Sequence, residues 1–138
     1  MSASRAQLRL QSLRRAVTRL GEALEEPEDS PLNPDGTIQR FEFVFELCWK
    51  TLALVLADEG IDATTPREVL RAAFADELVT AEDGWLEMLE ARNLTSHAYD
   101  ERLASRVYGV IRMRFPVLEA TVASLEARLS ASDGEPDL

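Results

Sequence analysis

The chain has 138 residues, of which 46% are apolar, so it is long enough to bury one hydrophobic core and too short for two. Its formal net charge of −10 works against loose, sequence-independent binding to nucleic acid, which depends on clustered cations. We therefore expect one acidic domain in which any contact with RNA is confined to a local site.

The sequence also predicts the compartment and excludes several kinds of chemistry. No stretch approaches the roughly 20 apolar residues that span a bilayer, and the first residues lack the apolar core of a secretory signal, so we expect a cytoplasmic protein without a membrane partner. A single cysteine and a single histidine exclude an internal disulfide and a cysteine- or histidine-rich metal site. Because the neighbours of Cys48 in the sequence are apolar, we expect its thiol to be buried rather than to act as a nucleophile. We expect neither a metal nor a cofactor.

The first predicted element is an amphipathic helix over roughly residues 4 to 25. Apolar residues recur there at steps of three and four and form one stripe, made of Leu10, Leu13, Val17, Leu20 and Leu24. Residues 27 to 36 contain three prolines and a glycine, which predicts an exposed connection rather than another element.

The second predicted helix runs from Thr37 to about Glu59 and ends before Gly60. One apolar face consists of Ile38, Phe41, Phe45, Cys48, Leu52 and Val55, and a second face consists of Phe43, Leu47 and Leu54. A helix that is apolar on two sides lies at the centre of a bundle, or is shared between the core and a partner subunit.

A short third helix is predicted to begin after Thr65 and to end near Glu77. Thr65 is its expected N-cap, Pro66 lies at the first helical position, and Glu68 should reach back to complete a capping box. Thr80 is predicted to cap a fourth helix. The inward side of that helix should hold Trp85, Leu86, Met88 and Leu89.

Asp100 is a suitable N-cap for the fifth predicted helix, and Pro116 should kink that helix because its ring removes one backbone donor. The apolar residues of this helix are Leu103, Val107, Ile111, Leu118, Val122, Leu125 and Leu129. Residues 131 to 138 are expected to form a frayed tail. Because no segment alternates with a period of two, the expected fold is all-α: an antiparallel up-and-down four-helix bundle with one short extra helix, over residues 1 to 130.

The segment from Arg92 to Tyr99 brings a guanidinium, an amide, the single imidazole and a phenol close together in the sequence. On an ideal helix Arg92 and Tyr99 share one face, while Asn93 and His97 share another face roughly 120° away. All four could meet on one ligand only if the helix loosened near Ser96, or if a second subunit completed the site.

These groups suit phosphodiester cleavage without a metal. His97 could exchange a proton with a ribose 2′-hydroxyl or a leaving oxygen, Arg92 could neutralise the phosphate, and Asn93 could orient either one. The structural alternative is that Arg92 pairs with a carboxylate such as Glu87 or Glu90, and that His97 occupies a helix C-terminus because the helix dipole favours it there.

Glu46 and Lys50 stand one turn apart inside the apolar second helix, where they could support the site or simply lie on a solvated edge. The supporting role would have them meet Arg92 or His97 across the bundle, since a buried carboxylate needs a partner. Trp49 and Trp85 are better interpreted as core residues than as stacking platforms.

Three blocks of this sequence, residues 36–52, 66–70 and 85–100, resemble the nucleotidyltransferase substrate-binding proteins of the HEPN (higher eukaryotes and prokaryotes nucleotide-binding) superfamily. The resemblance covers nearly the whole chain in order. It implies a four-helix bundle that forms a homodimer and works beside a separate minimal nucleotidyltransferase, in many cases as a toxin–antitoxin pair.

The same resemblance implies roles for individual residues. The family's Arg-x4-6-His motif falls on Arg92 and His97, with Asn93 as its polar second residue, and ribonuclease members use it at the dimer interface without a metal. In related pairs the nucleotidyltransferase transfers AMP to a tyrosine two residues after the histidine, which here is Tyr99. Three functions remain open. The chain could be a metal-independent endoribonuclease that its nucleotidyltransferase partner silences, or a non-catalytic substrate-binding or acceptor subunit, with RNA or a nucleotide as the ligand. It could also be a plain helical adaptor.

Overall fold

The computed structural model describes residues 4–30 and 33–133. The elements are α1 (Arg5–Glu25), α2 (Asp35–Asp58), α3 (Pro66–Ala75), α4 (Glu82–Leu94), the 3₁₀ turn η1 (Thr95–His97) and α5 (Glu101–Asp133). Throughout these two ranges the regular structure is helical and contains no strand. The all-α prediction is confirmed.

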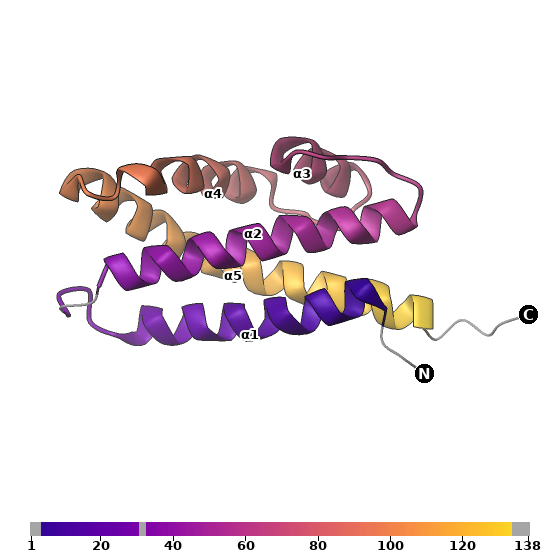
Figure 1. Cartoon of the computed structure of the whole chain (residues 1–138), viewed down its shortest axis with the longest axis horizontal. Coiled ribbons are helices and arrows are strands. Elements are labelled where there is room, and N and C mark those ends of the chain that lie inside the picture. The colour runs from indigo at the N-terminus through magenta and orange to yellow at the C-terminus, as the bar shows by residue number, and fades with distance from the viewer. Residues whose placement is uncertain (1–3, 31–32, 134–138) are drawn as a thin grey trace, which may run out of the picture.

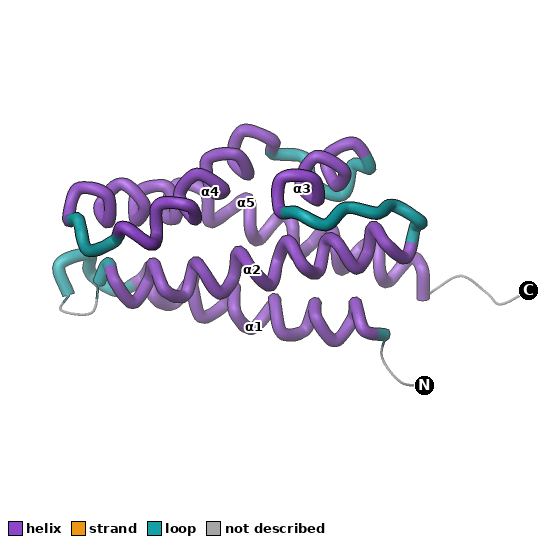
Figure 2. The backbone as a smooth tube through the Cα atoms, turned by 45° about the horizontal axis from the view of Figure 1, so that its top comes forward, coloured by secondary structure: helices purple, strands orange, loops and turns teal. Residues whose placement is uncertain are grey.

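The four long helices α1, α2, α4 and α5 alternate in direction, as in an up-and-down bundle (Figure 1). α1 packs along α2, and α5 contacts α1, α2 and α4. The short α3 lies beside the C-terminal half of α2 and contacts α4, so it covers one end of the bundle (Figure 2). The last turn of α4, η1 and the first turn of α5 meet at the opposite end (Figure 1).

The helix ends agree with the sequence signals in most places. The Ser4 side chain accepts a hydrogen bond from the Gln7 amide and begins α1, while α2 begins at Asp35, two residues before the predicted start. Thr65 caps α3 as predicted, but the Glu68 carboxylate accepts from the Thr64 amide at 3.2 Å instead of from the Thr65 amide. α3 ends at Ala75, before the predicted end at Glu77.

The two later caps differ from each other. The predicted cap at Thr80 is wrong, because α4 begins after Ala81 without any side-chain cap and has Glu82 and Asp83 in its first turn. The predicted cap at Asp100 is confirmed, since its Oδ1 accepts from the Arg102 amide at 2.9 Å. α5 is continuous through Pro116 and includes residues 131–133 of the expected tail, whereas residues 134–138 lie outside the described residues.

The core is formed by the apolar stripes that the sequence predicts. Fully buried side chains come from every long helix and include Leu13, Leu20, Phe41, Phe45, Leu52, Trp85, Met88, Ile111 and Leu118. Leu86, predicted to point inward, is instead 40% exposed. Trp85 is a core residue, and its indole N–H donates to Thr121 Oγ1 at 3.2 Å.

α2 has the two apolar faces that the sequence indicates. Its first face is buried, and burial of Cys48 raises the pKa of the thiol, which keeps it protonated and poorly nucleophilic. On its second face Leu47 and Leu54 are partly buried, but Phe43 is 62% exposed. The second face is therefore only partly covered by the rest of the chain.

α3 is tied to the rest of the bundle by a charge cluster at its C-terminal end. Arg128 of α5 pairs with Glu59 after α2, and its Nη1 lies 2.7 Å from Asp76 Oδ2 just after α3. The hydrogen bond from Arg128 holds the pKa of Asp76 below its usual value. Within the described ranges, no helix is both long enough and apolar enough to span a bilayer.

Candidate active site

The site begins where α4 ends. α4 stops at Leu94, and residues Thr95 to His97 continue as a single 3₁₀ turn. The Thr95 hydroxyl donates to the Arg92 carbonyl at 2.7 Å and so satisfies one of the acceptors that a helix end leaves free. The α-helix thus loosens near Ser96, which is one of the two conditions under which the sequence allows all four side chains to meet.

Arg92 is held in place by Glu46 of α2. Its Nε donates to Glu46 Oε1 at 3.1 Å, and its Nη2 contacts the same oxygen. Its Nη1 donates to Asn93 Oδ1 at 3.3 Å, and the guanidinium carbon lies 5.9 Å from the centre of the Phe45 ring. Of the two sequence interpretations of Glu46, the one in which it supports Arg92 across the bundle is therefore correct.

The second oxygen of Glu46 extends this contact into a small network on α2. The Trp49 indole N–H donates to Glu46 Oε2 at 3.1 Å, and Lys50 Nζ lies 3.8 Å from the same oxygen. Trp49 is partly buried and also lies 5.9 Å from the Lys50 ammonium. Each Glu46 oxygen thus accepts from at least one fixed donor, which sets the direction of its carboxylate.

The alternative pairing of Arg92 with Glu87 does not occur. Glu87 pairs instead with Arg114 of α5, and that hydrogen bond holds the pKa of Glu87 below its usual value. Glu90 is exposed. Arg92 is therefore paired with a carboxylate of α2 rather than with a carboxylate of its own helix.

His97 and Tyr99 form a second contact on the exposed turn. His97 Nδ1 lies 3.4 Å from the Tyr99 hydroxyl, and the two rings meet edge to face with their centres 6.0 Å apart. When the imidazole is neutral with its proton on Nε2, the phenol donates to Nδ1. Tyr99 is 83% exposed, and His97 is also exposed.

Within residues 33–133, no hydrogen bond or ion pair links the Arg92 group to the His97 group. One chain therefore presents two adjacent pairs, a fixed guanidinium with Asn93 and an exposed imidazole with Tyr99. The described residues also contain no group of three metal-ligating side chains. The chemistry that these side chains can supply is proton transfer, anion binding and acceptance of a transferred group.

A shallow hollow of about 360 Å³ lies beside Tyr99. It runs between the first turns of α2 and the segment after η1 and is lined by Asp35, Ile38, Gln39, Glu42, Ala98 and Tyr99. The hollow leaves one side of the phenol open to a large reactant. Neither Arg92 nor Glu46 lines the hollow, which is therefore a different surface from the Arg92 contact.

Two contributions to the site are absent from the sequence interpretation. Phe45 was assigned only to the core, although its ring also lies against the Arg92 guanidinium. Trp49 was assigned to the core, although its indole N–H supports Glu46. The spacing of three between Glu46 and Trp49 is the available signal for the second contact, because it places both side chains on one helix face.

The bundle, the break after α4 and the Arg92-to-His97 spacing agree with the HEPN-type fold that the sequence resemblance implies. The family model "Nucleotidyltransferase substrate binding protein like" matches residues 8–130. The chain belongs to this family. The resemblance to the HEPN-type nucleotidyltransferase substrate-binding family seen in the sequence is confirmed.

Two relatives show how far the likeness extends. The chain is 36% identical over 81 residues to the "Probable ribonuclease HepT" of Haemophilus influenzae, an alignment that covers 55% of this chain and 56% of that protein. A crystal structure of a Thermus thermophilus protein superposes with a TM-score of 0.72 at 32% identity, covering 85% of this chain and 98% of the other. The chain thus spans little more than half of the curated relative.

The contact between Glu46 and Arg92 should be measurable by a double-mutant cycle. Glu46→Ala is expected to lower the free energy of unfolding by roughly 1 to 2 kcal/mol, because it leaves a partly buried guanidinium without its acceptor. Combined with Arg92→Ala, chemical denaturation should give a coupling energy of about 1 kcal/mol. Glu42→Ala, an exposed carboxylate on the same helix, is the control. A coupling near zero would contradict the proposed fixing of Arg92.

Proposed function

We propose that this chain is the HEPN subunit of a cytoplasmic nucleotidyltransferase and HEPN pair of the toxin–antitoxin kind, and that it is a metal-independent endoribonuclease. In this proposal Arg92, Asn93 and His97 cleave RNA, and the partner nucleotidyltransferase silences the enzyme by transferring AMP to Tyr99. The ribonuclease name of the Haemophilus influenzae relative supports the first part. The family description supports the existence of a nucleotidyltransferase partner.

The observation that carries the proposal is the state of Arg92 and His97 at the end of α4. Contacts with Glu46 and Asn93 engage three of the five N–H donors of Arg92, so two remain for a phosphate oxygen. The Arg92 side chain is 34% exposed, and His97 is exposed on the following turn. An anchored cation with free donors, followed on the next turn by an exposed imidazole, suits an RNA phosphodiester.

The reaction needs only groups that these residues supply. Neutral His97 takes the proton from a ribose 2′-hydroxyl, and the oxygen attacks the adjacent phosphorus. The bond from phosphorus to the 5′-oxygen breaks, leaving a 2′,3′-cyclic phosphate, and a protonated imidazole or water gives the 5′-oxygen its proton. Arg92 neutralises the charge on the phosphate oxygens, and Asn93 fixes the direction of the guanidinium or of the phosphate.

A homodimer completes the site in this proposal. Within one chain the Arg92 and His97 groups are adjacent but not joined, so a second copy would supply the imidazole that faces each guanidinium, or a second imidazole as the acid. Phe43, 62% exposed on the second apolar face of α2, provides the apolar surface for such a contact.

Transfer of AMP to Tyr99 would silence the site directly. His97 Nδ1 is 3.4 Å from the phenol oxygen and can accept its proton as that oxygen attacks the α-phosphate of ATP, with pyrophosphate leaving. The new phosphodiester then lies beside the imidazole and carries a negative charge that repels an RNA phosphate.

A second function is favoured by the exposure of Tyr99. The phenol is 83% exposed and lies beside an open hollow. A side chain that accepts a transferred group needs such access, and this requirement is the same whether or not the chain cleaves RNA. In this alternative the chain is the non-catalytic substrate-binding subunit of a two-component nucleotidyltransferase. RNA cleavage in EDTA separates the two functions.

Substitution of His97 should remove the ribonuclease activity. The purified protein is expected to cleave RNA with EDTA present, and His97→Ala should lower the cleavage rate by at least about a hundredfold because the general base is lost. Gel assays with a labelled RNA measure the rate, and Arg15→Ala, an exposed arginine on α1, is the control for surface charge. Full activity in the His97 variant would disprove the catalytic assignment.

Substitution of Tyr99 should remove modification by the partner. After incubation with the neighbouring nucleotidyltransferase and ATP, intact-protein mass spectrometry should show added AMP on the natural chain and none on Tyr99→Phe, which lacks the acceptor oxygen. Tyr108→Phe, whose hydroxyl is buried, should gain the same mass as the natural chain. Equal labelling of the Tyr99 variant would place the modification elsewhere.

Substitution of Phe43 should separate the subunits. Light scattering of the natural chain should give the mass of a dimer, and Phe43→Glu should give a monomer, because a carboxylate at the centre of an apolar contact loses its hydration without gaining a partner. Leu8→Glu, which changes an exposed leucine on α1, should stay dimeric. Dimers of undiminished stability in the Phe43 variant would exclude this surface as the interface.

A further inference from the structure

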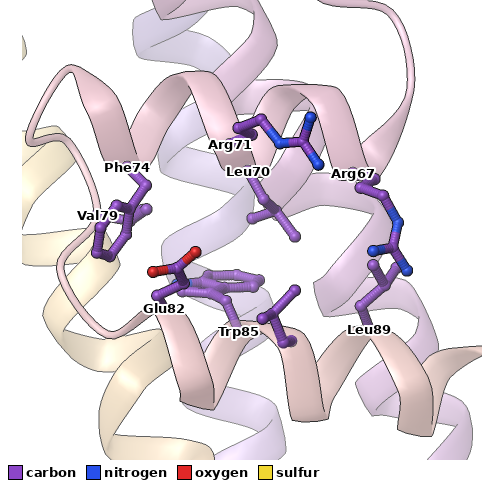
Figure 3. A pocket seen from close by; sticks show the side chains of 9 residues that line it. Arg67, Leu70, Arg71, Phe74, Val79, Glu82, Trp85 and Leu89 are labelled. Atoms are coloured by element: carbon purple, nitrogen blue, oxygen red, sulfur yellow. The ribbon is translucent and has the colours of Figure 1, made fainter.

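A groove between α3 and α4 forms a second concave feature on a part of the bundle that the proposed ribonuclease site does not use. The groove encloses about 150 Å³ and is lined by Arg67, Leu70, Arg71, Phe74, Val79, Glu82, Trp85, Leu86 and Leu89. Figure 3 shows the labelled side chains gathered around a common space, from α3, from α4 and, for Val79, from the segment between them. None of them belongs to the Arg92 or His97 groups.

The floor of the groove is apolar and has no unsatisfied polar group. Leu70 and Leu89 are each 5% exposed, and Trp85 is 2% exposed. The only polar atom of the Trp85 ring donates to Thr121, which does not line the groove, so the ring offers the groove an apolar surface. A volume of about 150 Å³ holds one benzene-sized group. The floor therefore suits a single ring or a branched aliphatic group.

The α3 wall of the groove carries positive side chains, and the α4 wall carries a negative one. Arg67 and Arg71 stand one turn apart on α3, and Glu82 stands in the first turn of α4 (Figure 3). Among the described residues, none of these three side chains takes part in an ion pair. Two adjacent arginines without carboxylate partners beside an apolar floor are suited to an external anion.

We propose that this groove binds a small organic anion that has one ring-sized apolar group and one carboxylate or phosphate group. The apolar group lies on Trp85, and the anionic group lies between Arg67 and Arg71. Glu82 repels a second negative charge at the other end of the ligand, so the site selects ligands that are charged at one end only. This inference stands apart from the proposed ribonuclease activity, because it uses different side chains.

The test is a titration of the full chain with three probes that share one ring. The probes are phenylacetate, benzylamine and 1,4-phenylenediacetate, and the readout is the nitrogen–proton NMR spectrum, including the indole signal of Trp85. Trp49→Phe assigns that signal. Phenylacetate should shift Trp85 and the α3 and α4 amides with a dissociation constant of about 1 mM, while the cation and the dianion should bind at least about tenfold more weakly.

Substitutions then separate the two charge effects. The double variant Arg67→Ala/Arg71→Ala should weaken phenylacetate binding about tenfold or more, and Arg15→Ala should leave it unchanged. Glu82→Gln should strengthen binding of the dianion and leave phenylacetate almost unaffected. Any one of four results would overturn the proposal. Two concern affinity: equal binding of phenylacetate and benzylamine, and unchanged affinity for phenylacetate in the double variant. The other two concern the spectra: shifts confined to other helices, and no shifts at about 10 mM phenylacetate.

Discussion

The arrangement at the functional end of this bundle depends on one partly buried ion pair, between Arg92 at the end of α4 and Glu46 in the middle of α2. The Arg92 and Glu46 side chains are each only about one third exposed, so both charges have lost part of their hydration. Each therefore needs a partner of opposite charge to compensate for that loss. The Phe45 ring beneath the guanidinium and the Trp49 indole against the carboxylate fix both groups further. The cation is therefore anchored before any ligand arrives, which limits the conformational entropy that binding would cost.

The residues after Arg92 are held quite differently. The α-helix gives way to a 3₁₀ turn, which brings His97 and Tyr99 to the surface with few contacts to the core. One half of the site is thus rigid and the other half is accessible. This division fits a catalyst whose proton-transfer group must also be reached by a modifying enzyme, because a buried tyrosine could not enter a second active site.

The sequence predicted the parts of this structure that follow from periodicity. Leu13 and Leu20 on α1, and Phe41 and Phe45 on α2, are buried because their spacings, seven and four residues, place each pair on one face of its helix. Local capping was less certain: Asp100 accepts from two amides as expected, whereas the chain turns into α4 at Ala81 without using Thr80. The site could be located but not assembled from sequence, because spacing along one helix does not tell which helix lies opposite. For that reason Glu46 allowed two interpretations until the packing of α2 against α4 resolved them.

The closeness of His97 and Tyr99 has a consequence for how the proposed silencing would work. In this structure a group bonded to the phenol oxygen begins on an atom that lies 3.4 Å from the imidazole nitrogen. Inhibition would then need no change of fold and no movement of α4, since the added phosphate would occupy the space of the substrate phosphate. The anchored Arg92 would be left intact, so removing the AMP would restore a site whose cation had never moved. In this proposal a reversible switch needs only one exposed turn, while the ion pair beneath it keeps the rest of the site in its active geometry.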